Sequence, residues 1–152
     1  MKITVCSIAK SDKDCYKTIC DRFVKMSSRW AQVEDRELFN SKITRAQELG
    51  EGKAQKAYEE ILNPWLSRGL SVALDPKGKG HDTHAFAKML ADRHEVVFFI
   101  GGAYGHSETF LNRCDRVVTL SPLTMSHKVA KVVLFEQIYR ALTILNGHPY
   151  HK

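Results

Sequence analysis

The chain has 152 residues, 43% of them hydrophobic and 26% charged, a balance ordinary for one globular domain over residues 1–152. No apolar run is long enough to cross a membrane, and the first residues lack the features of a signal peptide, so we expect a cytoplasmic protein. The formal net charge of +6 and a pI near 9.2 favour a polyanionic partner such as RNA, with a merely solvated basic surface as the alternative.

The cysteines and histidines do not show the spacing of a metal site. The four cysteines lack any Cys-x-x-Cys pair, and the seven histidines contain no His-Glu-x-x-His pattern. Cys15 and Cys20 fall on one predicted helix, too far around it to bind a metal together. We therefore expect buried, reduced thiols and no metal.

The first half of the chain predicts two strands separated by a helix. Residues 2–8 alternate like a strand, and Ser11 or Asp12 is placed to cap the helix that follows. Residues 30–39 predict a second strand despite many charges. Residues 40–53 are polar and interrupted by glycine, which is typical of a mobile loop.

The second half repeats the order of helix and strand. A helix with apolar positions from Ala54 to Trp65 is expected to end near Pro64, with Gly69 as its cap. The further expected elements are strands at 70–74, 96–100 and 117–120 and helices beginning near residues 82, 107 and 127. This alternation predicts an α/β fold with a mostly parallel sheet flanked by helices.

The final helix, residues 127–145, is apolar around most of its middle. Its residues 129–138 include three valines, a leucine, a phenylalanine and an isoleucine. A helix that is apolar on most sides must be covered on most sides. We therefore expect a homodimer formed through this helix, the alternative being a single deeply buried helix.

Two apolar strands each end in a loop that contains almost no charge. Residues 101–105 read Gly-Gly-Ala-Tyr-Gly, and residues 121–126 read Ser-Pro-Leu-Thr-Met-Ser. Neither loop has the Gly-x-Gly-x-x-Gly or Gly-Lys-Ser/Thr pattern of phosphate binding, which disfavours a nucleotide hydrolase. Loops at the carboxyl ends of parallel strands are where such sheets bind ligands, and this pair suits an adenine ring.

These loops belong to a set of motifs that resembles a known family. The others are Leu74-Asp75, Glu136-Gln137-x-Tyr139-Arg140-Ala141 and the ending Pro149-Tyr150-His151-Lys152. Together they resemble the RlmH (YbeA-like) family of ribosomal large-subunit pseudouridine N3-methyltransferases, in the SPOUT superfamily. The resemblance covers essentially the whole chain.

The resemblance implies a fold, a cofactor and a substrate. It implies a SPOUT-type sheet with a C-terminal trefoil knot, a homodimer, and S-adenosylmethionine as the cofactor. The implied substrate is a pseudouridine in helix 69 of 23S ribosomal RNA, in the large subunit or the assembled ribosome. The alternative is a non-catalytic basic module of the same fold that binds RNA or the ribosome.

Site residues are carried over by their positions in these motifs. The implied cofactor-binding residues are Leu74, Gly101, Gly102, Leu120, Ser121, Pro122, Leu123, Thr124, Met125 and Ser126. Family members often carry Pro-Glu or Ser-Asn between the glycines, where this chain has Ala103-Tyr104. A side-chain role at that acidic position is therefore not carried over.

The titratable candidates for catalysis lie near the end of the chain. Removal of the N3 proton needs assistance at neutral pH, for which His127, His148, Tyr150 and His151 are the titratable candidates. The catalytic residues expected from the resemblance are Tyr150, His151, Arg140 and His127, with Arg140 reaching the cofactor of a partner chain or the RNA. His127 has an alternative role in capping the last helix, and Arg140 can form an i,i+4 pair with Glu136. The tail beyond Gly147 is expected to fold over the site and to hold RNA.

Overall fold

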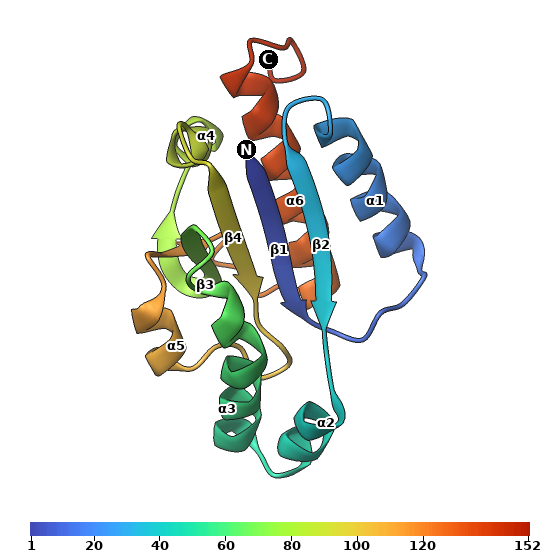
Figure 1. Cartoon of the computed structure of the whole chain (residues 1–152), viewed down its shortest axis with the longest axis vertical. Helices are drawn as coiled ribbons and strands as arrows, with labels where there is room; N and C mark the ends of the chain where they lie inside the picture. The colour runs from blue at the N-terminus through green and yellow to red at the C-terminus, as the bar shows by residue number, and fades with distance from the viewer.

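The computed structural model describes residues 1–152 and shows a five-stranded parallel sheet (Figure 1). The strand order is β2-β1-β4-β3-β5. The strands are β1 Lys2–Ile8, β2 Gln32–Leu38, β3 Leu70–Gly80, β4 Glu95–Ile100 and β5 Arg116–Thr119. The predicted α/β class with a mostly parallel sheet is confirmed, whereas the trefoil knot stays a prediction.

Strand β4 lies in the middle of the sheet because both of its faces are apolar. Val96, Phe98 and Ile100 contribute to one hydrophobic core. Val97 and Phe99 contribute to a second core on the opposite face. Alternate residues of a strand point to opposite faces, so this continuous apolar run is buried on both.

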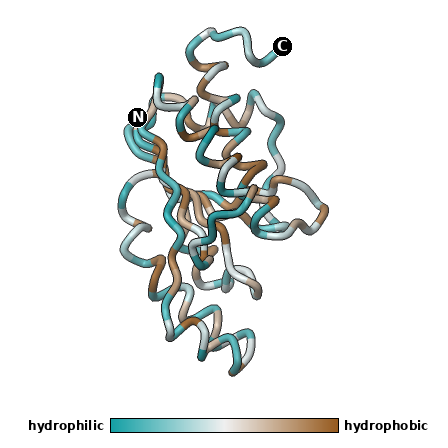
Figure 2. Tube along the Cα trace, turned by 90° about the vertical axis from the view of Figure 1, so that its right-hand side faces the viewer, coloured by the Kyte–Doolittle hydropathy of each residue, from teal (hydrophilic) through white to brown (hydrophobic).

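Helices cover both faces of the sheet. The first core packs beneath α1 Cys15–Ser27, α4 Thr83–Leu90 and α6 His127–Leu145. The second core packs beneath α2 Ser41–Glu48, α3 Glu51–Leu62 and α5 Glu108–Arg113, with a short 3-10 turn at Asn63–Trp65. Hydrophobic segments gather in the middle of the molecule in Figure 2, where the strands lie. No helix has the length and apolar character needed to span a membrane.

The charges of β2 are explained by the helices beside it. The ammonium of Lys131 in α6, itself only 6% exposed, donates to the Glu37 carboxylate at 2.7 Å. Lys17 of α1 donates to Asp35 at 3.2 Å. Ionic groups are rarely buried without a partner, so these pairs allow a charged strand to lie at the edge of the sheet beneath two helices.

The prediction of a mobile loop over residues 40–53 is wrong. Asn40 caps α2 by accepting a hydrogen bond from the backbone N–H of Ile43, whose side chain is fully buried. Gly50, at a φ of 108°, separates α2 from α3. The eight residues of α2 are too few and too polar to show the periodic pattern that predicts a helix from sequence, and residues 51–53 form the first turn of the helix predicted from Ala54 onward.

Two expected caps also differ from the structure. Asp14, rather than Ser11 or Asp12, caps α1 by accepting from the Lys17 N–H at 2.9 Å. Gly69 does not cap a helix but precedes β3 at a φ of 145°. A β-carbon there would lie 2.3 Å from the Glu95 carbonyl oxygen, so the approach to β4 requires glycine.

The cysteines are free thiols, as expected, but they are not all buried. Cys6 and Cys20 are buried, and burial raises their pKa values to about 12 and about 11. Cys15 lies on the exposed face of α1, contrary to the expectation of buried thiols. No group of three or more His, Cys, Asp or Glu side chains converges in a way that could hold a metal ion.

Candidate active site

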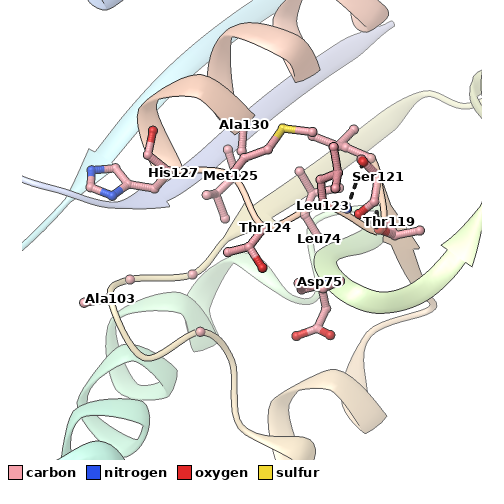
Figure 3. A pocket seen from close by; sticks show the side chains of 17 residues that line it. Leu74, Asp75, Ala103, Thr119, Ser121, Leu123, Thr124, Met125, His127 and Ala130 are labelled. Carbon is pink, nitrogen blue, oxygen red and sulfur yellow. Dashed lines mark hydrogen bonds between the residues drawn. The ribbon is translucent and has the colours of Figure 1, made fainter.

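A cavity of about 350 Å³ opens at the carboxyl ends of β4 and β5, beside the middle of β3. Its walls are the glycine loop 101–105, the loop 120–126, residues 74–76 of β3 and the first turn of α6 (Figure 3). Nine of the ten predicted cofactor residues line it: Leu74, Gly101, Gly102, Leu120, Ser121, Leu123, Thr124, Met125 and Ser126. Pro122 does not line the cavity and is exposed.

Short-range hydrogen bonds shape the loop that follows β5. The Ser121 N–H donates to Thr119 Oγ1 at 3.2 Å, while that hydroxyl donates to the Ser121 carbonyl at 2.7 Å. The Leu123 N–H donates to Ser121 Oγ at 3.0 Å. This turn leaves the Leu123 side chain 77% exposed at the cavity. Ser126 then caps α6, accepting from the Val129 N–H.

The glycine loop is a tight turn closed by its own backbone. The Gly105 N–H donates to the Gly102 carbonyl at 3.0 Å, and Gly105 has a φ of 68°. A β-carbon on Gly101 would lie 2.9 Å from the Gly105 carbonyl carbon. A β-carbon on Gly102 would lie 2.6 Å from the Tyr58 ring. The close approach at Gly102 is thus to a side chain of the protein itself, while its backbone borders the cavity.

Two titratable side chains line the cavity. One is Asp75, which follows Leu74 in β3. Leu74 and Lys79 of β3 both pair with Val118 of β5, so the pairing of the two strands is interrupted between them, and Asp75 is the first residue of this interruption. Asp75 Oδ1 accepts from the Lys77 N–H at 2.9 Å. His127 begins α6, and its imidazole points away from Leu74 and Leu123 in Figure 3.

Asp75 is a cavity residue that the sequence reasoning did not assign. The available signal was its position directly after a predicted strand, next to the assigned Leu74. Its carboxylate lies just beyond the part of β3 that pairs with β4, level with the carboxyl end of β4, where such sheets bind ligands. It is the only acidic side chain of a wall that otherwise combines apolar residues and glycines with serines, threonines and one histidine.

The other three predicted catalytic residues lie far from this cavity. Arg140, Tyr150 and His151 are at the C-terminal end of α6, whereas the cavity is at its N-terminal end (Figure 1). The helix has 19 residues, which corresponds to about 28 Å. Because α6 separates them, the tail does not reach the cavity within one chain, and its expected place over the site stays a prediction.

The tail is ordered by aromatic and ionic contacts of its own. The Tyr150 ring lies 4.7 Å from the Tyr139 ring, and the Arg140 guanidinium lies 4.8 Å from the Tyr150 ring. Arg140 also donates to Glu136 and lies 3.2 Å from His151 Nδ1. Partial burial and the Glu136 charge raise the Tyr150 pKa, so the phenol stays protonated near neutral pH and can donate a hydrogen bond.

The cavity has the chemistry that an adenine-containing cofactor needs. Leu74, Leu123 and Met125 present apolar side chains, and the two loops present backbone N–H and C=O groups. A volume of about 350 Å³ falls within the range of small-molecule sites. The residues present fit S-adenosylmethionine, with Asp75 as a negative charge that suits its cationic groups.

Known proteins resemble this chain over its full length. A family model described as "Predicted SPOUT methyltransferase" matches residues 1–151. Ribosomal RNA large subunit methyltransferase H of Aliarcobacter butzleri is 51% identical over 152 residues, covering 100% of both chains. The protein of the same name from Nitratiruptor sp. is 47% identical, covering 99% of both.

Solved structures share the fold at much lower sequence identity. A probable methylase family protein from Haemophilus influenzae superimposes with a TM-score of 0.59 at 12% identity, over 99% of this chain and 70% of that one. A putative RNA methyltransferase from Bacillus anthracis superimposes with a TM-score of 0.52 at 14% identity, over 99% of this chain and 97% of that one. With the family model and the relatives at 47–51% identity, these findings show that the chain belongs to the SPOUT methyltransferase family.

Proposed function

We propose that this protein is an S-adenosylmethionine-dependent methyltransferase of large-subunit ribosomal RNA, acting on N3 of a pseudouridine in helix 69. The observation that carries the proposal is the apolar cavity between the glycine loop and the loop 120–126. Its support comes from full-length relatives that are named ribosomal RNA large subunit methyltransferases. The basic balance of the chain, +6, suits a ribosomal substrate in the cytoplasm.

The residues of the cavity have distinct roles in this proposal. The cofactor supplies an activated methyl group, and the protein binds it, orients it and excludes water. Leu74, Leu123 and Met125 would pack against the adenine, while backbone groups of the two loops would bind its polar edge. The carboxylate of Asp75 would offset the positive charge of the cofactor.

A second copy of the chain is needed to complete the site. Within one chain, the tail lies a helix length away from the cavity. Along α6, Val129 is exposed and Val133, one turn further on, is only half-buried, which leaves a short apolar stripe on the outer face, whereas Val132 packs against the core. Two copies packed antiparallel through this stripe bring the tail of each to the cavity of the other.

In this homodimer, the tail of one protomer meets the RNA at the cavity of its partner. The Tyr150 phenol and the Arg140 guanidinium are placed to hold a splayed base and its phosphate. His151 and His127 carry imidazole groups, the side chains that most often serve in general acid–base catalysis, so they are the candidates to accept the N3 proton. Each protomer then contributes residues to both sites.

The proposal is tested by cofactor binding and by methylation of ribosomes. Leu123→Ser removes an apolar contact without disturbing the core, because the side chain is 77% exposed. We expect at least about tenfold weaker binding of S-adenosylmethionine in calorimetry. Leu49→Ser is the matched control, since Leu49 is 72% exposed and lies outside the cavity.

Mass spectrometry of helix 69 provides the second measurement. Ribosomes from a strain that lacks the gene should gain one methyl group on the pseudouridine when incubated with the wild-type protein and S-adenosylmethionine. Absence of cofactor binding at high protein concentration would overturn the proposal. It would leave the non-catalytic module that binds RNA or the ribosome.

A further inference from the structure

The glycine loop of the cavity is held from its outer side by helix α3. The Gln55 side-chain amide donates to the Tyr104 carbonyl at 3.0 Å and to the His106 carbonyl at 3.3 Å. These two carbonyls lie on either side of Gly105, the residue at positive φ. One amide group thus joins both arms of the turn to α3, although Gln55 does not itself line the cavity.

Tyr58 supports the same loop one helical turn further along α3. Its side chain is only 1% exposed and fills the space where Gly102 lacks a β-carbon. Its hydroxyl donates to Gln47 Oε1 at 2.7 Å, which links α3 to α2. The Tyr104 hydroxyl of the loop lies 3.4 Å from the Gln47 carbonyl oxygen, which connects the loop back to α2.

A third residue of α3 reaches the segment that follows the loop. The Ser107 hydroxyl, which caps α5, donates to the Glu59 carboxylate. Gln55, Tyr58 and Glu59 are spaced at i, i+3 and i+4, so they share one face of the helix. That face contacts the chain continuously from Gly102 to Ser107.

Such support matters because only two residues of the loop, Ala103 and Tyr104, have side chains that can order it. Three of its five residues are glycine, which has more backbone freedom to lose than any other residue. A binding site that is formed only part of the time has an apparent affinity reduced by that fraction. Hydrogen bonds that hold the loop before the ligand arrives remove this loss.

We propose that Gln55 is a positioning residue for the cofactor, with Tyr58 and the α2–α3 pair as its support. Gln55 acts through the backbone of the glycine loop and touches neither cofactor nor RNA. This inference rests on the proposed methyltransferase function and adds a residue outside the cavity to it. The resulting dependence is specific: the affinity for S-adenosylmethionine changes, whereas the methyl-transfer step and ribosome binding do not.

The test compares Gln55→Leu with variants that keep or restore a donor. Gln55→Leu retains the approximate size of the side chain but cannot donate, and the loss of two hydrogen bonds should weaken S-adenosylmethionine binding about tenfold. We expect KM for the cofactor to rise by the same factor, while kcat and KM for ribosomes stay within about twofold. Gln55→Lys, which carries a donor on a long side chain, should recover part of the affinity.

Lys56→Leu is the matched control. Lys56 is the exposed neighbour of Gln55 on the same helix, and its side chain makes no hydrogen bond or ion pair. Its substitution should leave the cofactor affinity, kcat and both KM values unchanged. Thermal unfolding of each variant separates loop positioning from loss of fold, because Gln55→Leu should unfold within a few degrees of the wild type. Tyr58→Phe removes only the bond to Gln47 and should give a smaller effect than Gln55→Leu.

Two outcomes would contradict the inference, and each differs from a failure of the proposed function. Unchanged cofactor affinity in Gln55→Leu, with normal binding by the wild type, would show that the hydrogen bonds do not order the loop. An equal loss in Gln55→Leu and Gln55→Lys, together with a much lower unfolding temperature, would assign Gln55 to the fold alone. If the wild type itself does not bind S-adenosylmethionine, the proposed function fails first.

Discussion

His106 is a buried titratable side chain immediately beyond the glycine loop. Its Nε2 lies 3.2 Å from the Phe99 carbonyl oxygen, and its ring stacks on Phe110 with centroids 4.9 Å apart. Burial lowers the pKa of His106, since an imidazolium there loses its hydration; the Phe99 carbonyl and the Asp75 charge oppose this only in part. The folded protein therefore holds the imidazole neutral.

A prediction at this scale concerns stability in mild acid. In the unfolded chain, His106 takes up a proton near pH 6.5, whereas in the folded protein its pKa lies lower. Between these two pKa values the unfolded chain therefore binds more protons than the folded protein does. The free energy of unfolding should thus be constant above about pH 6.5 and fall as the pH is lowered below it. Denaturant unfolding of wild type and His106→Gln between pH 7.5 and 5 measures this, and the variant should lose less stability.

The carboxylates with lowered pKa values do not account for a loss of stability between pH 7.5 and 5. The pKa values of Asp115 and Glu34 are lowered by hydrogen bonds from Ser71 and Arg36, respectively, so their contribution is present above their unfolded values and is lost only in stronger acid. A wild type whose stability does not change between pH 7.5 and 5 would show that His106 protonates without cost.

Among the elements, α6 has one buried side and one open side. Phe135 is 1% exposed and belongs to the core beneath α1 and α4, whereas Val133 is half-buried on the outer stripe. The two residues are close in sequence, but their positions around the helix give them different neighbours. Sequence periodicity could not separate them because nearly all positions of this segment are apolar.

Substitutions on the two sides of α6 should therefore affect different properties, folding stability on the buried side and dimerisation on the open side. Phe135→Ala should lower the free energy of unfolding by about 3–5 kcal/mol, since it leaves a cavity in the core. Val133→Asp should remain folded but sediment as a monomer without methylation activity, because the charge disrupts the apolar stripe. Light scattering and circular dichroism distinguish these results, and a fully active monomer would contradict the proposed interface.

At the scale of the whole molecule, the distance between the tail and the cavity of one chain is the basis of the proposed homodimer. Each chain carries both parts, yet α6 holds them about 28 Å apart. Active sites formed between two protomers can be restored by mixing chains with different defects. Sites formed within one chain cannot be restored in this way.

We therefore predict complementation between two variants that are each defective in one part of the site. One lacks Tyr150, His151 and Lys152, and the other carries Leu123→Ser and is assayed at a cofactor concentration well below its Kd, where its own activity is low. Co-expression should form mixed dimers in which one of two sites is intact, so about a quarter of the wild-type methylation activity should return. Activity that stays at the level of the single variants would place tail and cavity of one site on the same chain.

Local patterns in the sequence predicted much of this protein. Period-two and continuous apolar runs predicted the five strands, since burial on one or both faces of a sheet requires those residue types. Three helices were predicted to begin near residues 82, 107 and 127, and they do so because Asp82, Ser107 and Ser126 accept hydrogen bonds from nearby backbone N–H groups. The two uncharged loops were predicted as the cofactor site for the same local reason, because each directly follows a buried strand.

Contacts between residues distant in the chain were decided by the tertiary structure alone. The order β2-β1-β4-β3-β5, the Tyr58 ring against Gly102 and the Gln55 bonds to the glycine loop join segments that no sequence pattern connects. The position of the tail is the clearest case. Its aromatic and basic residues predicted a ligand-binding role, but only the folded 19-residue helix α6 sets how far the tail lies from the cavity of its own chain.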